Sequence, residues 1–224
     1  MSEGENSMAG RTRGADGWRF LRQWLRNPLS VAAVAPSSRQ LARRMVSELP
    51  EGTRRVIELG GGTGVFTRAI LERGVSPANL LVLELNEDLA RLLRERFLGA
   101  RVVCGDAREL HTLATQSGYF EDGPADAVIS GLGLLSMARQ TQREILRAAF
   151  EAMRPEGRMV QFTYGPVSPV PRALLDDLEL NVRRSAFAWW NMPPATVYVF
   201  TRRRSRGIVA TKVRAGKGGA RSTW

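Results

Sequence analysis

Short apolar runs alternate with stretches whose apolar residues recur every three or four positions along most of the chain. This alternation predicts strands followed by helices, because apolar residues on one face recur with a period of two in a strand and about 3.6 in a helix. A Pro-Pro turn sequence separates the last two extended segments, which favours an antiparallel pair at one edge. We therefore expect an α/β fold with a doubly wound, mostly parallel sheet, with strands over residues 54–59, 80–84, 101–104, 127–130, 159–164, 179–189 and 196–203, and helices over residues 65–73, 87–97 and 142–153.

The composition predicts a single globular domain. Of the 224 residues, 43% are hydrophobic and 25% are charged, which is typical of a folded protein rather than a disordered or fibrous one. The apolar stretches fall short of the roughly 20 residues that a membrane span needs, and no leader sequence opens the chain, so we expect neither a transmembrane nor an exported protein. The single cysteine, Cys104, and the single histidine, His111, predict no disulfide and no metal centre.

The charge of the chain is strongly basic and unevenly distributed. Lys and Arg number 33 against 22 Asp and Glu, which gives a formal net charge of +11, and all but two of the basic residues are arginine. Residues 201–224 contain eight of these basic residues and no acid. This basic end favours an anionic partner, either nucleic acid or an acidic membrane surface; the alternative is a solvated tail or an expression remnant.

A glycine-rich loop follows the first predicted strand and precedes a predicted helix. Glycines at 60, 62 and 64 allow the backbone to turn sharply and to approach a ligand closely. The loop does not fit a dinucleotide-binding fingerprint, because the third glycine would fall at Val65, and no Lys-Ser/Thr pair follows as in a phosphate loop. Glu58, two residues upstream, favours a cationic ligand over a nucleotide phosphate.

A second acid lies at the end of the next predicted strand. Glu84 follows the first loop glycine by 24 residues. At that place an acid accepts hydrogen bonds from ribose hydroxyls in nucleotide-binding sheets, so we expect Glu84 to do the same.

The loop resembles motif I of class I S-adenosylmethionine-dependent methyltransferases. The resemblance implies a Rossmann-like fold with a seven-stranded sheet, and S-adenosylmethionine as the cofactor, with S-adenosylhomocysteine as its product. It implies that Glu58 interacts with the cationic amino acid end of the cofactor and that Asp106 with Ala107 binds the adenine amino group. The alternative for Asp106 is an N-cap of the next short helix. The expected cofactor contacts are Glu58, Gly60, Gly61, Gly62, Thr63, Gly64, Glu84, Leu85, Asp106, Ala107, Ser130 and Gly131.

The segment after the fourth predicted strand indicates the methyl acceptor. Methyltransferases that act on exocyclic base nitrogens usually carry Asn/Asp-Pro-Pro-aromatic here, whereas this chain carries Ser130, Gly131 and Leu132. Such an apolar loop favours an acceptor that brings an aliphatic amine on an apolar body.

Residues 18–26 predict an amphipathic helix. At 100° per residue, two tryptophans and three other apolar residues fill one continuous arc, and arginines with one glutamine fill the other. This composition is typical of a helix that lies in the lipid headgroup layer, and the alternative is a helix that packs on the domain over the cofactor cleft. The residues expected to contact membrane or substrate are Trp18, Phe20, Leu21, Arg22, Trp24, Leu25, Arg26 and Leu132.

From residue 18 to residue 203 the chain resembles the bacterial phospholipid N-methyltransferases of the single-enzyme phosphatidylethanolamine type. The residues that carry the resemblance are Phe20-Leu21, Asn27-Pro28, Val34-Ala35-Pro36-Ser37-Ser38, Ile129-Ser130-Gly131-Leu132 and Asn191-Met192-Pro193-Pro194-Ala195, together with the cofactor motifs. The chain departs from the family at Gly133, where proline is expected.

This resemblance implies up to three methyl transfers to phosphatidylethanolamine, through mono- and dimethyl intermediates, giving phosphatidylcholine. It implies a peripheral enzyme on the inner face of the bacterial cytoplasmic membrane, with an anionic lipid surface and not nucleic acid as its partner. Tyr164 and Asn191 are the candidate catalytic residues; ordinary edge packing and a plain hairpin turn are the alternatives.

The expected division of the chain is a flexible start (1–17), a membrane-associating helix and linker (18–36), a methyltransferase domain (37–204) and a basic tail (205–224). The alternative function is an RNA adenine N-methyltransferase, which shares the cofactor loop and favours a basic tail.

Overall fold

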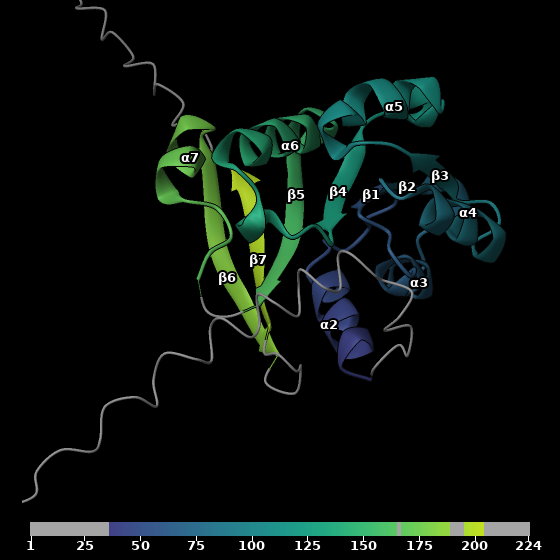
Figure 1. Ribbon diagram of the computed structural model, residues 1–224, viewed down its shortest axis with the longest axis horizontal. Coiled ribbons are helices and arrows are strands. Elements are labelled where there is room, and N and C mark those ends of the chain that lie inside the picture. The colour runs from purple at the N-terminus through teal and green to yellow at the C-terminus, as the bar shows by residue number, and fades with distance from the viewer. Residues whose placement is uncertain (1–35, 165–166, 189–194, 204–224) are drawn as a thin grey trace, which may run out of the picture.

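The computed structural model describes residues 36–164, 167–188 and 195–203. Within them, seven strands form one sheet in the order β3-β2-β1-β4-β5-β7-β6 (Figure 1). The first five strands pair in parallel, and β7 runs antiparallel to both of its neighbours, so the expected fold class and its antiparallel edge are confirmed. The strands are β1 Val56–Leu59, β2 Leu80–Glu84, β3 Arg101–Cys104, β4 Ala125–Ser130, β5 Met153–Tyr164, β6 Leu180–Ala188 and β7 Ala195–Arg202.

Helices cover both faces of the sheet, and each face has its own apolar core. One core joins the sheet to α2 (Pro36–Ser47), α3 (Val65–Glu72) and α4 (Glu87–Arg96). The other joins the sheet to α5 (Leu110–Gln116), α6 (Arg139–Glu151) and α7 (Arg172–Asp177). Single 3-10 turns complete the described elements: η2 (Pro77–Asn79), η3 (Ala107–Glu109), η4 (Tyr119–Asp122) and η5 (Leu134–Ser136).

The boundary between α6 and β5 differs from the expected one. The helix ends at Glu151, and β5 begins at Met153, six residues before the expected start. The backbone N–H of Ala125 donates to Ala152, and a register shift between β4 and β5 accommodates Pro155. Gly157 lies in this irregular part, where a Cβ would come within 2.9 Å of a backbone carbonyl. The strand therefore continues, through a bulge, across a Pro and a Gly that are typical of the end of a helix.

Helix α2 was not among the predicted elements. Leu41, Met45 and Val46 recur on one face and are buried in the core beside α3. Glu48, just after the helix, accepts hydrogen bonds from the side chains of Arg183 and Ser185 on β6, which fixes the end of α2 against the sheet.

The predicted membrane helix at 18–26, the turn at 191–194 and the tail at 205–224 lie outside the described residues. Among the residues that are described, no helix combines the length and the apolar character needed to cross a bilayer.

Candidate cofactor and acceptor site

The loop between β1 and α3 lies at the carboxyl edge of the sheet, where the chain connections diverge on the two sides of β1. The N–H groups of Gly60 and Gly61 both donate to the carbonyl of Leu83 on β2, at 2.8 and 3.2 Å. On the other side, Gly131 N–H donates to the carbonyl of Leu59 at 2.8 Å. The loop is thus held between the ends of β2 and β4, at the switch point where open α/β sheets bind ligands.

Gly62 and Gly64 in this loop require glycine for different structural reasons. Gly62 has φ 52° and Gly64 has φ 82°, values that favour glycine. A Cβ at position 64 would overlap the ring of Phe97, whereas a Cβ at position 62 would meet nothing within 4 Å. Gly64 is therefore required by packing, and Gly62 leaves open space in front of the loop backbone for a ligand.

The carboxylate of Glu84 holds the loop from the end of β2. Its Oε2 accepts from the backbone N–H of Gly62 at 2.8 Å, and its Oε1 accepts from the backbone N–H of Asn86 at 2.9 Å. Each carboxylate oxygen has a second lone pair, so these bonds leave acceptor capacity for the ribose hydroxyls that the sequence predicts. The loop-holding role was not predicted, because no spacing in the sequence indicates a bond between a carboxylate and a loop amide.

Glu84→Gln is expected to weaken cofactor binding about tenfold, because the amide retains only one of the two oxygen acceptors and leaves one partly buried N–H without its charged partner. The measurement is titration calorimetry with S-adenosylhomocysteine. Glu87→Gln, an exposed substitution on the adjoining helix, serves as the control and should leave the affinity unchanged. Equal affinities for the wild type and Glu84→Gln would contradict the assignment.

Glu58 lies on β1 and is completely buried. Its Oε2 accepts from the hydroxyl of Thr67 on α3 at 2.7 Å, while its Oε1 is buried with no hydrogen-bond partner among the described atoms. Burial raises the pKa of Glu58 to about 8, against hydrogen bonds from Thr67 that lower it. Below that pH the group is mainly neutral, and a nearby cation would favour its ionised form.

Asp106 follows β3 and caps η3. Its carboxylate accepts from the backbone N–H of Arg108 at 2.8 Å and forms an ion pair with the guanidinium of the same residue at 2.7 Å, and the hydrogen bond from Arg108 lowers the pKa of Asp106. The N-cap alternative is therefore realised in the structure. The side chain is still partly exposed, so an adenine amino group remains compatible with it.

The other expected cofactor contacts lie around the same edge. Leu85 is 70% exposed directly after Glu84, which leaves an apolar surface beside the ribose position. The carbonyl of Thr63 accepts from Arg96 at 2.9 Å. The remaining positions follow the strand ends: Gly60 and Gly61 after β1, Ala107 in η3, and Ser130 and Gly131 at the end of β4.

The loop after β4 packs directly on the glycine loop. A Cβ at Gly60 would come within 2.9 Å of Leu132 Cδ2, and a Cβ at Gly131 within 2.9 Å of the carbonyl of Gly60. The amide of Gln161, buried on β5, donates to the carbonyl of Leu132 at 2.8 Å. A role for Gln161 was not predicted from the sequence. The signal for such a role is a polar residue within the apolar run Met159–Phe162.

Tyr164 ends β5 within an aromatic row. Its ring contacts Phe162 edge-on at 5.4 Å, and Phe162 contacts Phe66 of α3 at 5.7 Å. Burial raises the pKa of Tyr164 above its ordinary value. The row extends from the glycine loop to the end of β5. Asn191, the other candidate catalytic residue, lies outside the described residues.

The residues present fit a cationic nucleoside cofactor. Gly62 offers an open backbone, Glu58 has a buried oxygen without a partner among the described atoms, and three acids lie at the carboxyl ends of β1, β2 and β3. Within the described ranges, no three or more His, Cys, Asp and Glu side chains gather as metal ligands.

Comparisons with known proteins agree with a binding site for a cationic nucleoside cofactor. Residues 56–157 match the family model of a methyltransferase domain. The chain is 35% identical over 189 residues to ornithine lipid N-methyltransferase from Singulisphaera acidiphila, a match that covers 82% of this chain and 94% of that protein. It is 36% identical over 81 residues to ribosomal RNA small subunit methyltransferase A from Synechococcus, which covers 35% of this chain and 26% of the relative.

Solved structures share the fold. The 1,6-didemethyltoxoflavin-N1-methyltransferase from Burkholderia thailandensis, with bound S-adenosylhomocysteine, aligns with a TM-score of 0.59 at 17% identity and covers 89% of this chain and 93% of its own. The cofactor prediction is confirmed: S-adenosylmethionine is the methyl donor. The chain therefore belongs to the class I S-adenosylmethionine-dependent methyltransferases, in the same family as the ornithine lipid N-methyltransferase.

Proposed function

We propose that the chain methylates the primary amine of a membrane lipid headgroup, with phosphatidylethanolamine as the acceptor and up to three successive transfers to phosphatidylcholine. The observation that carries the proposal is the apolar loop at residues 130–132, packed on the glycine loop where base-methylating enzymes have Asn/Asp-Pro-Pro-aromatic. Similarity to a lipid N-methyltransferase over nearly all of that relative's length supports it. The competing methyl acceptor is the headgroup of an ornithine lipid, the substrate named for that relative.

The chemistry requires little from protein side chains beyond placement. S-adenosylmethionine supplies a methyl group on a positively charged sulfur, ready for in-line displacement. The chain has to hold a neutral amine in line with that methyl group, and placement of this kind supplies most of the rate. An alkylammonium has a pKa of about 10, and an apolar surrounding next to a positive charge lowers it towards neutrality.

Tyr164 is the residue that we propose for orienting the amine. Its neutral hydroxyl can accept the amine N–H, and its ring face can hold the charged product. Leu132 and Gly131 would exclude water beside the reacting atoms, with Gln161 fixing the loop. Asn191 is proposed to present its backbone carbonyl to the headgroup.

We further propose that residues 18–26 attach the enzyme to the inner face of the cytoplasmic membrane. The apolar arc would lie among acyl chains, and the arginines would contact anionic headgroups, each contributing roughly 1 kcal/mol. Deletion of residues 1–26 is expected to abolish sedimentation with anionic vesicles while leaving cofactor affinity unchanged. Equal sedimentation of the shortened and full chains would contradict this attachment.

The function is tested by offering the full chain methyl-labelled S-adenosylmethionine together with three acceptors in separate reactions. The acceptors are vesicles containing phosphatidylethanolamine, vesicles containing ornithine lipid, and ribosomal RNA. We expect label in phosphatidylethanolamine at the highest rate. If most label enters ornithine lipid, the chain is a lipid N-methyltransferase with ornithine lipid, not phosphatidylethanolamine, as its substrate. If only RNA is labelled, the proposal is wrong and the chain is an RNA methyltransferase.

A further inference from the structure

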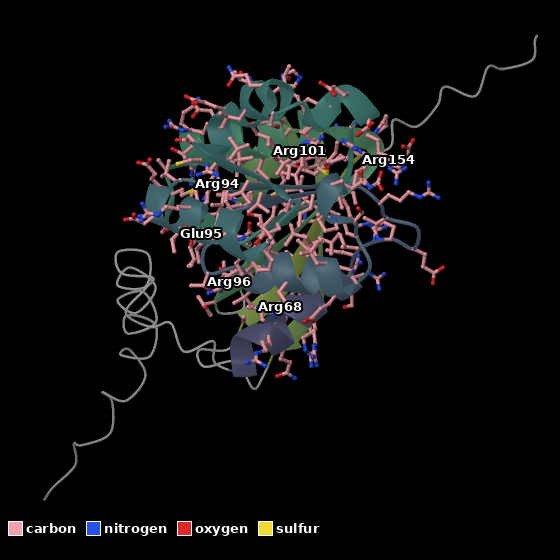
Figure 2. All side chains as sticks on the ribbon, turned by 90° about the vertical axis from the view of Figure 1, so that its right-hand side faces the viewer. Arg68, Arg94, Glu95, Arg96, Arg101 and Arg154 are labelled. Carbon is pink, nitrogen blue, oxygen red and sulfur yellow. The ribbon has the colours of Figure 1, made fainter. Side chains whose placement is uncertain are left out.

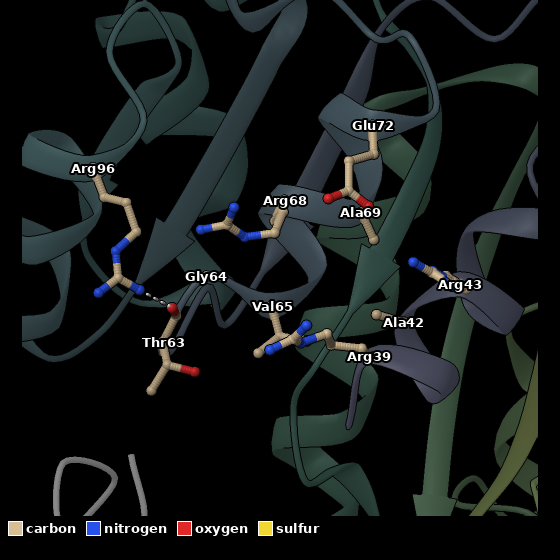
Figure 3. Close-up of a pocket in the computed structure, with 10 residues that line it drawn as sticks. All are labelled: Arg39, Ala42, Arg43, Thr63, Gly64, Val65, Arg68, Ala69, Glu72 and Arg96. Carbon is tan, nitrogen blue, oxygen red and sulfur yellow. Dashed lines mark hydrogen bonds between the residues drawn. The ribbon is translucent and has the colours of Figure 1, made fainter. Parts of the chain in front are cut away.

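A cavity of about 350 Å³ lies between α2, one face of α3 and the end of α4 (Figure 3). Its charged lining consists of four arginines, Arg39, Arg43, Arg68 and Arg96, and one acid, Glu72. Three different elements supply the arginines, and Arg39 and Arg43 are four positions apart on α2, so they lie on one helix face. Arg68 and Arg96 lie on the same side of the molecule, on neighbouring helices (Figure 2).

These arginines are not neutralised by the part of the chain that the structure describes. The side chains of Arg39, Arg43 and Arg68 make no hydrogen bond or ion pair with any described residue, and Glu72 makes no ion pair with any of them. By contrast, Arg55, Arg91, Arg108, Arg143, Arg154, Arg183 and Arg203 each form an ion pair. Like charges repel when they share a cavity, and an anionic ligand removes that cost.

The cavity adjoins the cofactor loop but not the acceptor side. Thr63 and Gly64 contribute to its lining, whereas the loop at 130–132 and Tyr164 do not. Arg96 also donates to the carbonyl of Thr63, so the same guanidinium contacts both the cavity and the loop. In addition, the cavity meets the amino end of α3, where the helix dipole favours negative charge.

We propose that this cavity binds the phosphate group of an anionic membrane lipid that is not the methyl acceptor. Guanidinium groups bind phosphate oxygens in bidentate fashion, and four of them against one carboxylate match a phosphate better than a neutral or zwitterionic group. Arg39, Arg43 and Arg68 are exposed, so a headgroup at a surface can reach them.

The position of α2 supports a membrane source for the phosphate. Helix α2 begins at Pro36, ten residues after the last residue of the predicted membrane helix, and ten residues span at most about 35 Å. If that helix lies in the headgroup layer, Arg39 and Arg43 lie within reach of the same layer. The inference rests on the proposed function only in placing the enzyme at a membrane.

The test compares two double variants of the full chain that remove equal charge. Arg39→Gln/Arg68→Gln changes the cavity, and Arg139→Gln/Arg147→Gln changes two exposed arginines of α6, on the other face of the sheet, which likewise make no described ion pair. Binding is measured by sedimentation with vesicles of phosphatidylcholine alone and with added phosphatidylglycerol. We expect the cavity variant to bind phosphatidylglycerol vesicles at least about tenfold more weakly than wild type, and the α6 variant less than about threefold more weakly.

Cofactor affinity without vesicles should be equal in wild type and both variants. A cavity variant that loses cofactor affinity would show that the cavity holds part of the cofactor, and equal losses of vesicle binding in both variants would show only the effect of net charge. Submillimolar affinity for glycerol 3-phosphate, or a cavity-dependent preference for an RNA oligonucleotide over vesicles, would also overturn the inference. Because binding is measured without turnover, a chain that binds selectively but methylates no lipid contradicts only the proposed function.

Discussion

Replacing Glu58 with glutamine is expected to lower the affinity for S-adenosylmethionine about a hundredfold at about pH 9, where the carboxylate is already ionised before the cofactor binds. A carboxylate about 6 Å from a unit positive charge, at an effective dielectric constant of about 20, contributes roughly 3 kcal/mol. Glutamine keeps the acceptor for the Thr67 hydroxyl and removes the charge, so the local packing is preserved. Calorimetric titration measures the loss, and an affinity within about threefold of wild type would contradict the role of Glu58.

The pH dependence of binding follows from the same residue. The pKa of about 8 leaves Glu58 mostly protonated at pH 6, and binding of a cation then requires release of that proton. The affinity should therefore rise by about tenfold between pH 6 and pH 7.5 in the wild type and stay nearly constant in Glu58→Gln. Titrations in two buffers of different ionisation enthalpy report the released proton directly.

The free energy of unfolding should fall as the pH rises, whereas the cofactor affinity rises. Because burial raises the pKa of Glu58 from 4.5 to about 8, the folded state holds the proton more tightly than the unfolded state. The associated stability is fully present below pH 4.5 and is lost as the pH rises through about 8. Urea denaturation should show a free energy of unfolding that falls over this interval in the wild type and falls less in Glu58→Gln.

Gly64→Ala is expected to lower the free energy of unfolding by about 3 kcal/mol or more, because the new methyl group overlaps the buried ring of Phe97. Gly62→Ala is the matched control. It has the same left-handed backbone cost of about 1 to 2 kcal/mol but meets no neighbour, so its additional loss should be small.

The two glycine variants should separate stability from binding. Gly62→Ala places a methyl group in the open space before the loop, and we expect it to weaken cofactor binding at least tenfold while remaining folded. Urea denaturation together with titration of S-adenosylhomocysteine distinguishes the two effects. Equal stability of both variants would contradict the packing argument for Gly64.

Much of the fold was predictable because the local patterns agree with the tertiary structure. β3 lies where a short apolar run predicted it, and the antiparallel pair β6–β7 lies where the Pro-Pro turn between two extended segments predicted it. Asn86 caps α4 by accepting a hydrogen bond from the N–H of Leu89, which agrees with the preference for asparagine before a helix. α2 was not predicted, although Leu41, Met45 and Val46 recur at helical spacing and are buried beside α3. The start of β5 was not predicted because Pro155 and Gly157 lie in a bulge.

The site was predictable at the level of residue types and not of contacts. Glycine spacing and the order of Glu58, Glu84 and Asp106 indicate the cofactor, because consecutive parallel strands bring their carboxyl ends to one edge. The bond from Glu84 to the loop and the ion pair of Asp106 depend on backbone geometry that no spacing encodes. The arginine cavity joins positions 39, 68 and 96, which come together only when three helices pack on one face.

The most direct test is a crystal structure of the full chain with S-adenosylhomocysteine bound. We predict that the ribose hydroxyls lie within hydrogen-bond distance of Glu84, that the adenine amino group lies at Asp106, and that the amino acid end lies over Gly62 on the side of Glu58. A ligand that contacts none of these three acids, or that lies in the cavity of Arg39 and Arg68, would contradict the account.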